Sequence, residues 1–119
     1  MSRVLPTIVE TSIFSRRAEK LLTADERDEL MIYLSTFYAA GDEIQGTGGV
    51  RKLRFAAQAR GKSGGVRVIY YFYDELNPLY AMLLYGKNEQ ASLSPDQKKY
   101  VTDMAAFVRS SAKARRNNQ

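Results

Sequence analysis

The chain has 119 residues and carries 18 Lys and Arg against 13 Asp and Glu, a formal net charge of +5. It contains no His and no Cys, which excludes imidazole acid–base catalysis, thiol nucleophiles and disulfides, and removes the usual ligands of zinc sites. The length predicts one domain with one core, and the positive charge favours an acidic partner such as nucleic acid or a negatively charged protein. No signal-peptide pattern and no run of about 18 apolar residues is present, so we expect a cytoplasmic protein without a membrane partner.

The first part of the chain predicts a strand followed by two helices. Residues 7–10 form a short segment rich in β-branched side chains, which predicts a strand. Thr11 or Ser12 can cap a first helix. The segment from Thr23 to Glu26 is a capping box that opens a second helix. The apolar positions expected to be buried are Phe14, Ala18, Leu21 and Leu22 in the first helix, and Leu30, Tyr33, Leu34 and Phe37 in the second.

Three strand-like segments follow a glycine-rich loop at residues 41–49. In the first, Lys52 and Arg54 alternate with apolar residues, so the cations and the apolar side chains point to opposite faces of the sheet. The second is apolar on both sides, as in a central strand, except for Arg67. A turn leads into the third, which ends at Gly86.

A second capping box, from Ser94 to Gln97, opens a last helix. We expect the domain to occupy residues 1–108 and the polar, basic tail at residues 109–119 to fray. The order of elements predicts a small α+β domain, with its helices packed on one face of a twisted, mainly antiparallel sheet. The other face would be partly open and would carry the basic residues.

The motifs GDEIQGTGGVRKLRFA, GKSGGVRVIYYF and YGKNE, together with the order of elements, resemble the RelE/HigB toxins of bacterial type II toxin–antitoxin systems. The resemblance covers about Ile8 to Phe107 and is strongest to the HigB branch of the RelE/ParE superfamily. It implies a RelE/ParE-like fold and a ribosome-dependent endonuclease that cuts mRNA in the decoding site and so inhibits translation. It also implies a cognate antitoxin that neutralises the toxin and carries a helix-turn-helix DNA-binding domain.

The resemblance assigns roles to particular residues. Lys52 and Arg54 match the family's basic pair, Arg67 matches the arginine that contacts the scissile phosphate, and Lys87 matches the basic residue after the last strand. Two positions depart from the best-studied members: Asn88 replaces a second basic residue, and the base-stacking Tyr has no counterpart. Tyr71, Tyr73, Tyr85 and Tyr100 are candidates for that ring, although each is more simply a core residue. The further residues expected to contact RNA are Arg51, Arg60, Lys62 and Asn88.

Cleavage of RNA by its own 2′-hydroxyl needs a base, a stabilised phosphorane and a protonated leaving oxygen, but neither a metal nor another cofactor. Lys52 is the side chain most able to accept the proton, because neighbouring cations disfavour its charged form. Arg54 and Arg67 are better suited to hold the phosphate oxygens, and Lys87 would be a general acid or a third phosphate contact. With so few proton-transfer groups, much of the rate would come from the positioning of mRNA by the ribosome.

Simpler interpretations exist for three of these residues. Lys52 and Arg54 could be charges that protect an edge strand from aggregation. Arg67 could form a structural ion pair with one of the acids Glu10, Asp74 and Glu89. For function, a ParE-like toxin that poisons DNA gyrase and a noncatalytic ribosome- or RNA-binding homologue are alternatives. The basic set argues against the first, whereas Asn88 and the missing Tyr support the second.

Overall fold

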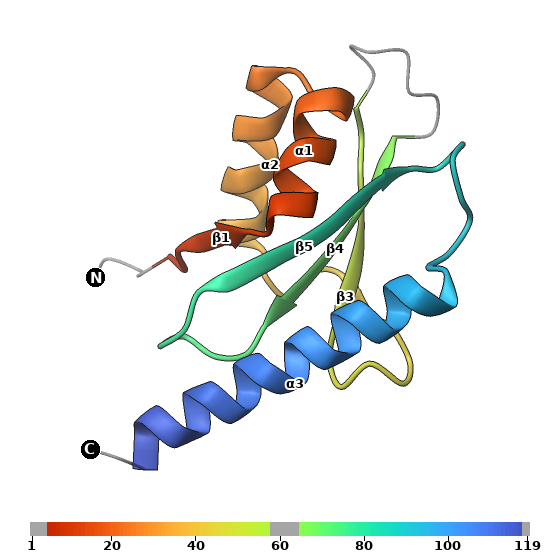
Figure 1. The fold of residues 1–119 in the computed structure, drawn as a ribbon. Coiled ribbons are helices and arrows are strands. Elements are labelled where there is room, and N and C mark those ends of the chain that lie inside the picture. Colours follow the sequence, from red (N-terminus) through yellow and green to blue (C-terminus); the bar gives the residue numbers. More distant parts are fainter. Residues whose placement is uncertain (1–4, 58–64, 118–119) are drawn as a thin grey trace.

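The computed structural model describes residues 5–57 and 65–117. They form a five-stranded sheet in the order β1-β5-β4-β3-β2, with helices on both of its faces (Figure 1). β1 runs parallel to β5, and the other neighbouring strands are antiparallel. The predicted α+β class and mainly antiparallel sheet are therefore confirmed. The elements are β1 (Ile8–Glu10), α1 (Ser12–Leu21), α2 (Ala24–Thr36), β2 (Asp42–Glu43), β3 (Arg51–Phe55), β4 (Val66–Phe72), β5 (Leu79–Gly86) and α3 (Pro95–Asn117).

The hairpin of α1 and α2 packs on one face of the sheet. Both caps form as predicted: Thr11 Oγ1 accepts a hydrogen bond from the Phe14 N–H, and Thr23 and Glu26 make a complete capping box. The core on this face joins the two helices to β3, β4 and β5. Its buried members include Phe14, Ala18, Leu21, Leu22, Leu30, Leu34, Leu53, Val68, Tyr70 and Leu84.

Two residues of the stripe predicted for α2 are not core residues. Tyr33 is 37% exposed and Phe37 is 53% exposed, and their rings contact each other with centroids 5.0 Å apart. Tyr33 is rotated by about 100° from buried Leu34 around the helix axis. Phe37 is the C-cap residue and has already left the helical conformation. Only Leu30 and Leu34 therefore anchor α2 as predicted.

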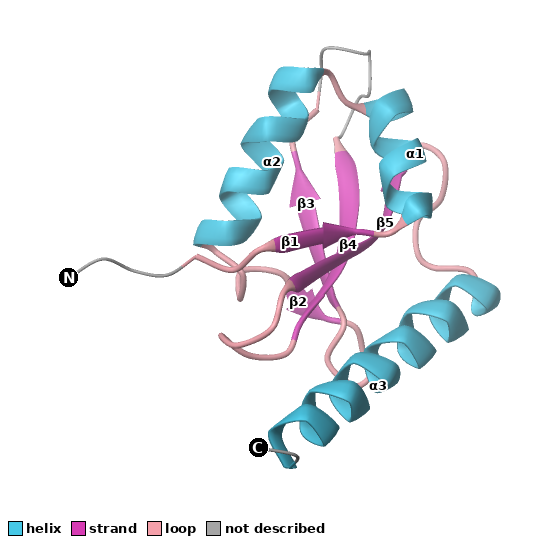
Figure 2. Ribbon diagram, turned by 60° about the vertical axis from the view of Figure 1, so that its left-hand side comes forward, coloured by secondary structure: helices cyan, strands magenta, loops and turns pink. Residues whose placement is uncertain are grey.

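The last helix packs on the opposite face of the sheet, so the prediction that all helices share one face was wrong (Figure 2). Val101, Ala105 and Val108 of α3 are buried in a second cluster with sheet residues that include Ile69 and Leu83. The physical reason is that β4 and β5 are apolar on both sides. One layer of helices would have left the second apolar face in water.

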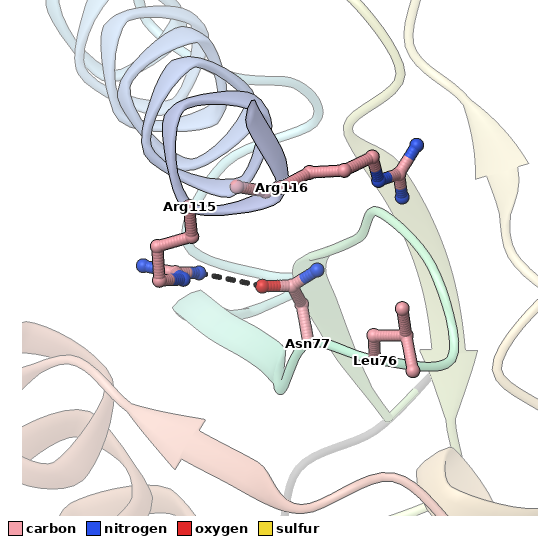
Figure 3. Close-up of a pocket in the computed structure, with 5 residues that line it drawn as sticks. Leu76, Asn77, Arg115 and Arg116 are labelled. Atoms are coloured by element: carbon pink, nitrogen blue, oxygen red, sulfur yellow. Dashed lines mark hydrogen bonds between the residues drawn. The ribbon is translucent and has the colours of Figure 1, made fainter. Parts of the chain in front are cut away.

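α3 is also longer than predicted, because it continues through the expected frayed tail to Asn117. Ala112 is buried, and the two arginines near the helix end contact the turn between β4 and β5. Arg115 donates to the side-chain oxygen of Asn77 at 2.6 Å, and Arg116 pairs with Asp74 at 2.9 Å. These contacts hold the helix end against the sheet, and Asn77, Arg115 and Arg116 line a small cavity there (Figure 3).

The glycine-rich segment contains a short strand, β2, that sequence patterns did not predict. The turn that follows is closed by Thr47, whose buried hydroxyl donates to the Ile44 carbonyl and accepts from the Val50 N–H. Gly48 has a φ of +75°, a conformation that favours glycine, and its carbonyl accepts a hydrogen bond from Arg109 of α3. The segment is thus a fixed turn leading into β3.

Candidate functional site

Two arginines and a tyrosine form one row across the central strands. Arg54 of β3 is the register partner of Arg67 on β4, and Arg67 is the register partner of Tyr85 on β5. Directly opposed residues of an antiparallel pair point to the same face, with Cβ atoms about 4.5–5.5 Å apart. Tyr85 is buried in the cluster that contains Val101 of α3, so the row lies on the α3 face of the sheet.

Lys52 belongs to the same face, because it stands two residues before Arg54 on β3. Arg54 is exposed, whereas Lys52 and Arg67 are half-buried. Although α3 covers the apolar part of this face, it leaves these cations accessible. The alternation that predicted Lys52 and Arg54 on a common face is confirmed.

The turn after β5 brings Lys87 to the same end of the sheet as Arg67. The backbone N–H of Lys87 donates to the Gly65 carbonyl, two residues before Arg67. Glu89 folds back over this turn and accepts a hydrogen bond from the Gly86 N–H at 2.8 Å. Lys87 and its neighbour Asn88 are both exposed. We call Lys52, Arg54, Arg67 and Lys87 the basic cluster.

One predicted RNA contact, Arg51, does not join this cluster. Arg51 is the register partner of Tyr70, which lies in the core on the opposite face. Its guanidinium donates to the carbonyls of Gly41 at 2.6 Å and Ala39 at 3.3 Å, and it pairs with Glu43 at 3.5 Å. Arg51 therefore ties β3 to the end of the helical hairpin. Arg60 and Lys62 lie outside the described residues.

The acids considered as structural partners of Arg67 each bind another arginine. Glu10 pairs with Arg27 at 2.5 Å, Glu89 with Arg17 at 2.5 Å, and Asp74 with Arg116 at 2.9 Å. Two of these pairs hold α1 and α2 to the sheet, and the third holds the end of α3.

The sequence did not predict that an acidic residue lies next to the basic cluster. Asp42 of β2 is the register partner of Lys52, and it is exposed. An opposite charge across a strand pair is favourable, and it places a carboxylate beside the predicted base. Nothing in the local sequence signals a two-residue strand, so this neighbour could be found only from the sheet pairing.

The candidate stacking tyrosines all belong to, or pack against, the cluster between α3 and the sheet. Tyr71 is 3% exposed, and its ring and hydroxyl contact Arg109. Tyr73 and Tyr100 are partly buried against the same cluster, and Tyr85 is 2% exposed. The simpler interpretation of these rings as core residues fits the structure. The hydroxyl of Tyr85 differs from the others in one respect: it is buried and has no hydrogen-bond partner.

Residues 7–117 match the protein-family model described as the RelE toxin of the RelE/RelB toxin–antitoxin system. The chain belongs to this RelE toxin family. Its fold is similar to that of a doubly substituted mutant of the E. coli toxin RelE in the free state, with a TM-score of 0.53 and 14% sequence identity. The similarity covers 74% of this chain and 90% of that chain. It supports the RelE-like fold, while membership of the HigB branch stays a prediction.

Among the described residues of this RelE-family toxin, no helix is long and apolar enough to cross a membrane. The family also implies an antitoxin as partner.

Proposed function

We propose that this RelE-family toxin is a ribosome-dependent mRNA endonuclease of the HigB branch, which stops translation by cutting mRNA in the decoding site. The observation that carries the proposal is the direct opposition of Arg54 and Arg67 beside Lys52. Like charges in opposed positions of a sheet are unfavourable unless an anion lies between them. A phosphodiester supplies that anion, and two guanidinium groups match its non-bridging oxygens.

In this proposal the 2′-hydroxyl of one nucleotide attacks the adjacent phosphorus, and the bond to the 5′-oxygen breaks. Arg54 and Arg67 stabilise the additional negative charge of the phosphorane. Lys52 takes the proton from the 2′-hydroxyl, and Lys87 either protonates the leaving oxygen or makes a third phosphate contact. The reaction needs no metal in this scheme, and exposed Asn88 contacts the RNA next to Lys87.

The ribosome would hold the RNA in the reactive geometry that the side chains alone do not impose. Lysine and arginine are weak proton-transfer groups at neutral pH, so the reaction depends on RNA held with its 2′-oxygen in line with the leaving oxygen. Binding of mRNA in the decoding site can impose that geometry. Action on translating ribosomes would also place the toxin in the cytoplasm.

The antitoxin would neutralise the toxin by covering the basic cluster or by displacing an element that must enter the ribosome. An acidic segment is suited to the first route, because it would compete with RNA for the same cations. We propose that this antitoxin carries a helix-turn-helix DNA-binding domain, as the family resemblance implies.

The proposal is tested by primer extension on cellular mRNA after brief expression of the toxin. Wild type should produce cuts within translated codons. Arg67→Ala, if folded, should reduce cutting by about 10²–10³-fold, the loss expected for one donor to a transition-state anion. Lys20→Gln removes a charge from exposed α1 and serves as the matched control.

Three outcomes would contradict the proposal. Normal cutting by a folded Arg67→Ala variant would remove Arg67 from the site. Absence of cutting combined with gyrase-dependent DNA breaks would indicate a ParE-like toxin. Ribosome binding without cutting under any condition would indicate a noncatalytic homologue.

A further inference from the structure

The hydroxyl of Tyr85 is the one buried side-chain polar atom of the described residues that makes no hydrogen bond. A buried polar group without a partner lowers the stability of the fold, so a phenylalanine would serve a purely structural role better here. Tyr70 on the neighbouring strand shows the usual arrangement. It is fully buried, and its hydroxyl accepts a hydrogen bond from the Gly41 N–H at 2.9 Å.

The position of Tyr85 connects it to the basic cluster. It is the register partner of Arg67, which is in turn the partner of Arg54, so all three side chains leave the sheet on the same face. Burial raises the pKa of the Tyr85 phenol, and the charge of Arg67 offsets this only in part. The hydroxyl therefore keeps its proton at neutral pH and acts as a donor.

Space is available next to this ring. Tyr85 lines a cavity of about 290 Å³ together with Leu83, Glu89 and Gln97. The cavity adjoins the turn that carries Lys87 and is large enough to hold water. Part of Tyr85 therefore borders open space, although its hydroxyl itself is buried.

We propose that Tyr85 is a further substrate-binding residue of the cleavage site, whose hydroxyl donates a hydrogen bond to the RNA phosphate held by Arg54 and Arg67. This inference rests on the proposed function. Arg67 stands directly opposite both Arg54 and Tyr85, so a phosphate held by the two arginines would lie next to the position of the phenol. A neutral donor would add a hydrogen bond to the phosphate without adding a third positive charge to the row.

The test is the variant Tyr85→Phe, which keeps the ring and removes only the hydroxyl. We expect the melting temperature to stay equal or rise, since no protein hydrogen bond is lost. Single-turnover cutting of mRNA on programmed ribosomes should fall about tenfold or more, while the affinity for ribosomes changes less than twofold. Tyr70→Phe is the matched control: it should lower the melting temperature and leave cutting by the folded protein unchanged.

A second measurement does not depend on cutting. A short 2′-deoxy oligonucleotide, which cannot be cleaved by this route, is titrated into the free wild-type protein, and the ring signals of Tyr85 are followed by NMR. We expect these signals to shift on binding, and the shift to be lost in Arg54→Gln.

Two results would overturn the role of Tyr85: equal cutting by wild type and Tyr85→Phe, or a bound oligonucleotide that leaves the Tyr85 signals unchanged. Failure of the proposed function looks different, because wild type itself would then not cut mRNA on ribosomes.

Discussion

Arg54 of β3 and Arg67 of β4 stand directly opposite each other and point to the same face of the sheet. Like charges in this arrangement weaken a strand pair by about 0.2–1 kcal/mol. The repulsion disappears when an anion binds between the two guanidinium groups. In the proposed function, the pair would give up some stability of the free protein in favour of binding a charged ligand, as is common at functional sites.

The first prediction tests whether Arg54 and Arg67 repel each other in the free protein. Arg54→Gln should raise the free energy of unfolding by about 0.5 kcal/mol at low salt, because it removes the repulsion with Arg67. The gain should shrink at 1 M salt, where charges are screened within about 3 Å. Urea denaturation at the two salt concentrations measures it, with Lys20→Gln as control. A lower stability of Arg54→Gln at low salt would show that the two arginines do not repel each other in the folded protein.

The second prediction concerns the base. Lys52→Arg keeps the positive charge but replaces the ammonium with a guanidinium that stays protonated. If Lys52 accepts the 2′ proton, this variant should bind ribosomes normally and lose most single-turnover cutting. Lys52→Gln, which loses charge and base together, should lose binding as well. Near-normal cutting by Lys52→Arg would reduce Lys52 to an electrostatic contact.

Much of the fold could be predicted because its signals are local. The capping boxes at Thr23 and Ser94 form with the hydrogen bonds that their sequences imply. The face chosen by α3 could not be predicted in the same way. The central strands are apolar on both sides, so both faces of the sheet must be buried. This pattern does not indicate which helix buries the second face.

In the candidate site, too, only the features that depend on local sequence could be predicted. Alternation along one strand was enough to place Lys52 and Arg54 on one face. The opposition of Arg54 to Arg67, the carboxylate of Asp42 beside Lys52 and the unpaired hydroxyl of Tyr85 all depend on strand register. Register is fixed by contacts between distant parts of the chain, so no local motif reveals it.

The third prediction concerns an ion pair that joins β1 to the helical hairpin. Glu10 accepts hydrogen bonds from Ser15 at 2.7 Å and Arg27 at 2.5 Å. Burial on its own would raise the pKa of Glu10, but these hydrogen bonds and the charge of Arg27 lower it below its ordinary value. The unfolded chain then binds more protons than the folded protein as the pH falls, so the stabilisation is fully present above the unfolded pKa, about 4.3, and is lost as the pH falls from there through the lower pKa of the folded protein.

Glu10→Gln should therefore lower the free energy of unfolding by about 1 kcal/mol at pH 7. The difference from wild type should begin to shrink as the pH falls below the unfolded pKa of about 4.3, and it should vanish below the lower pKa of the folded protein, where the carboxylate of wild type is also protonated. Denaturant titrations across this pH range measure the effect. Glu29→Gln, at an exposed position of α2, is the matched control, and an equal loss at every pH would rule out the carboxylate charge as the cause.

The last prediction concerns electrostatic binding to the ribosome. Each phosphate contact should contribute about −0.7 to the slope of log affinity against log salt for single-stranded RNA. Neutralising exposed Lys87 as Lys87→Gln should flatten the slope by up to about one unit if Lys87 touches a phosphate in the bound state. Lys20→Gln should leave the slope unchanged. Arg51→Gln should lower stability instead, because Arg51 binds the carbonyls of Gly41 and Ala39 on the opposite face. Equal flattening by Lys87→Gln and Lys20→Gln would mean that net charge, and not the basic cluster, attracts the toxin to the ribosome.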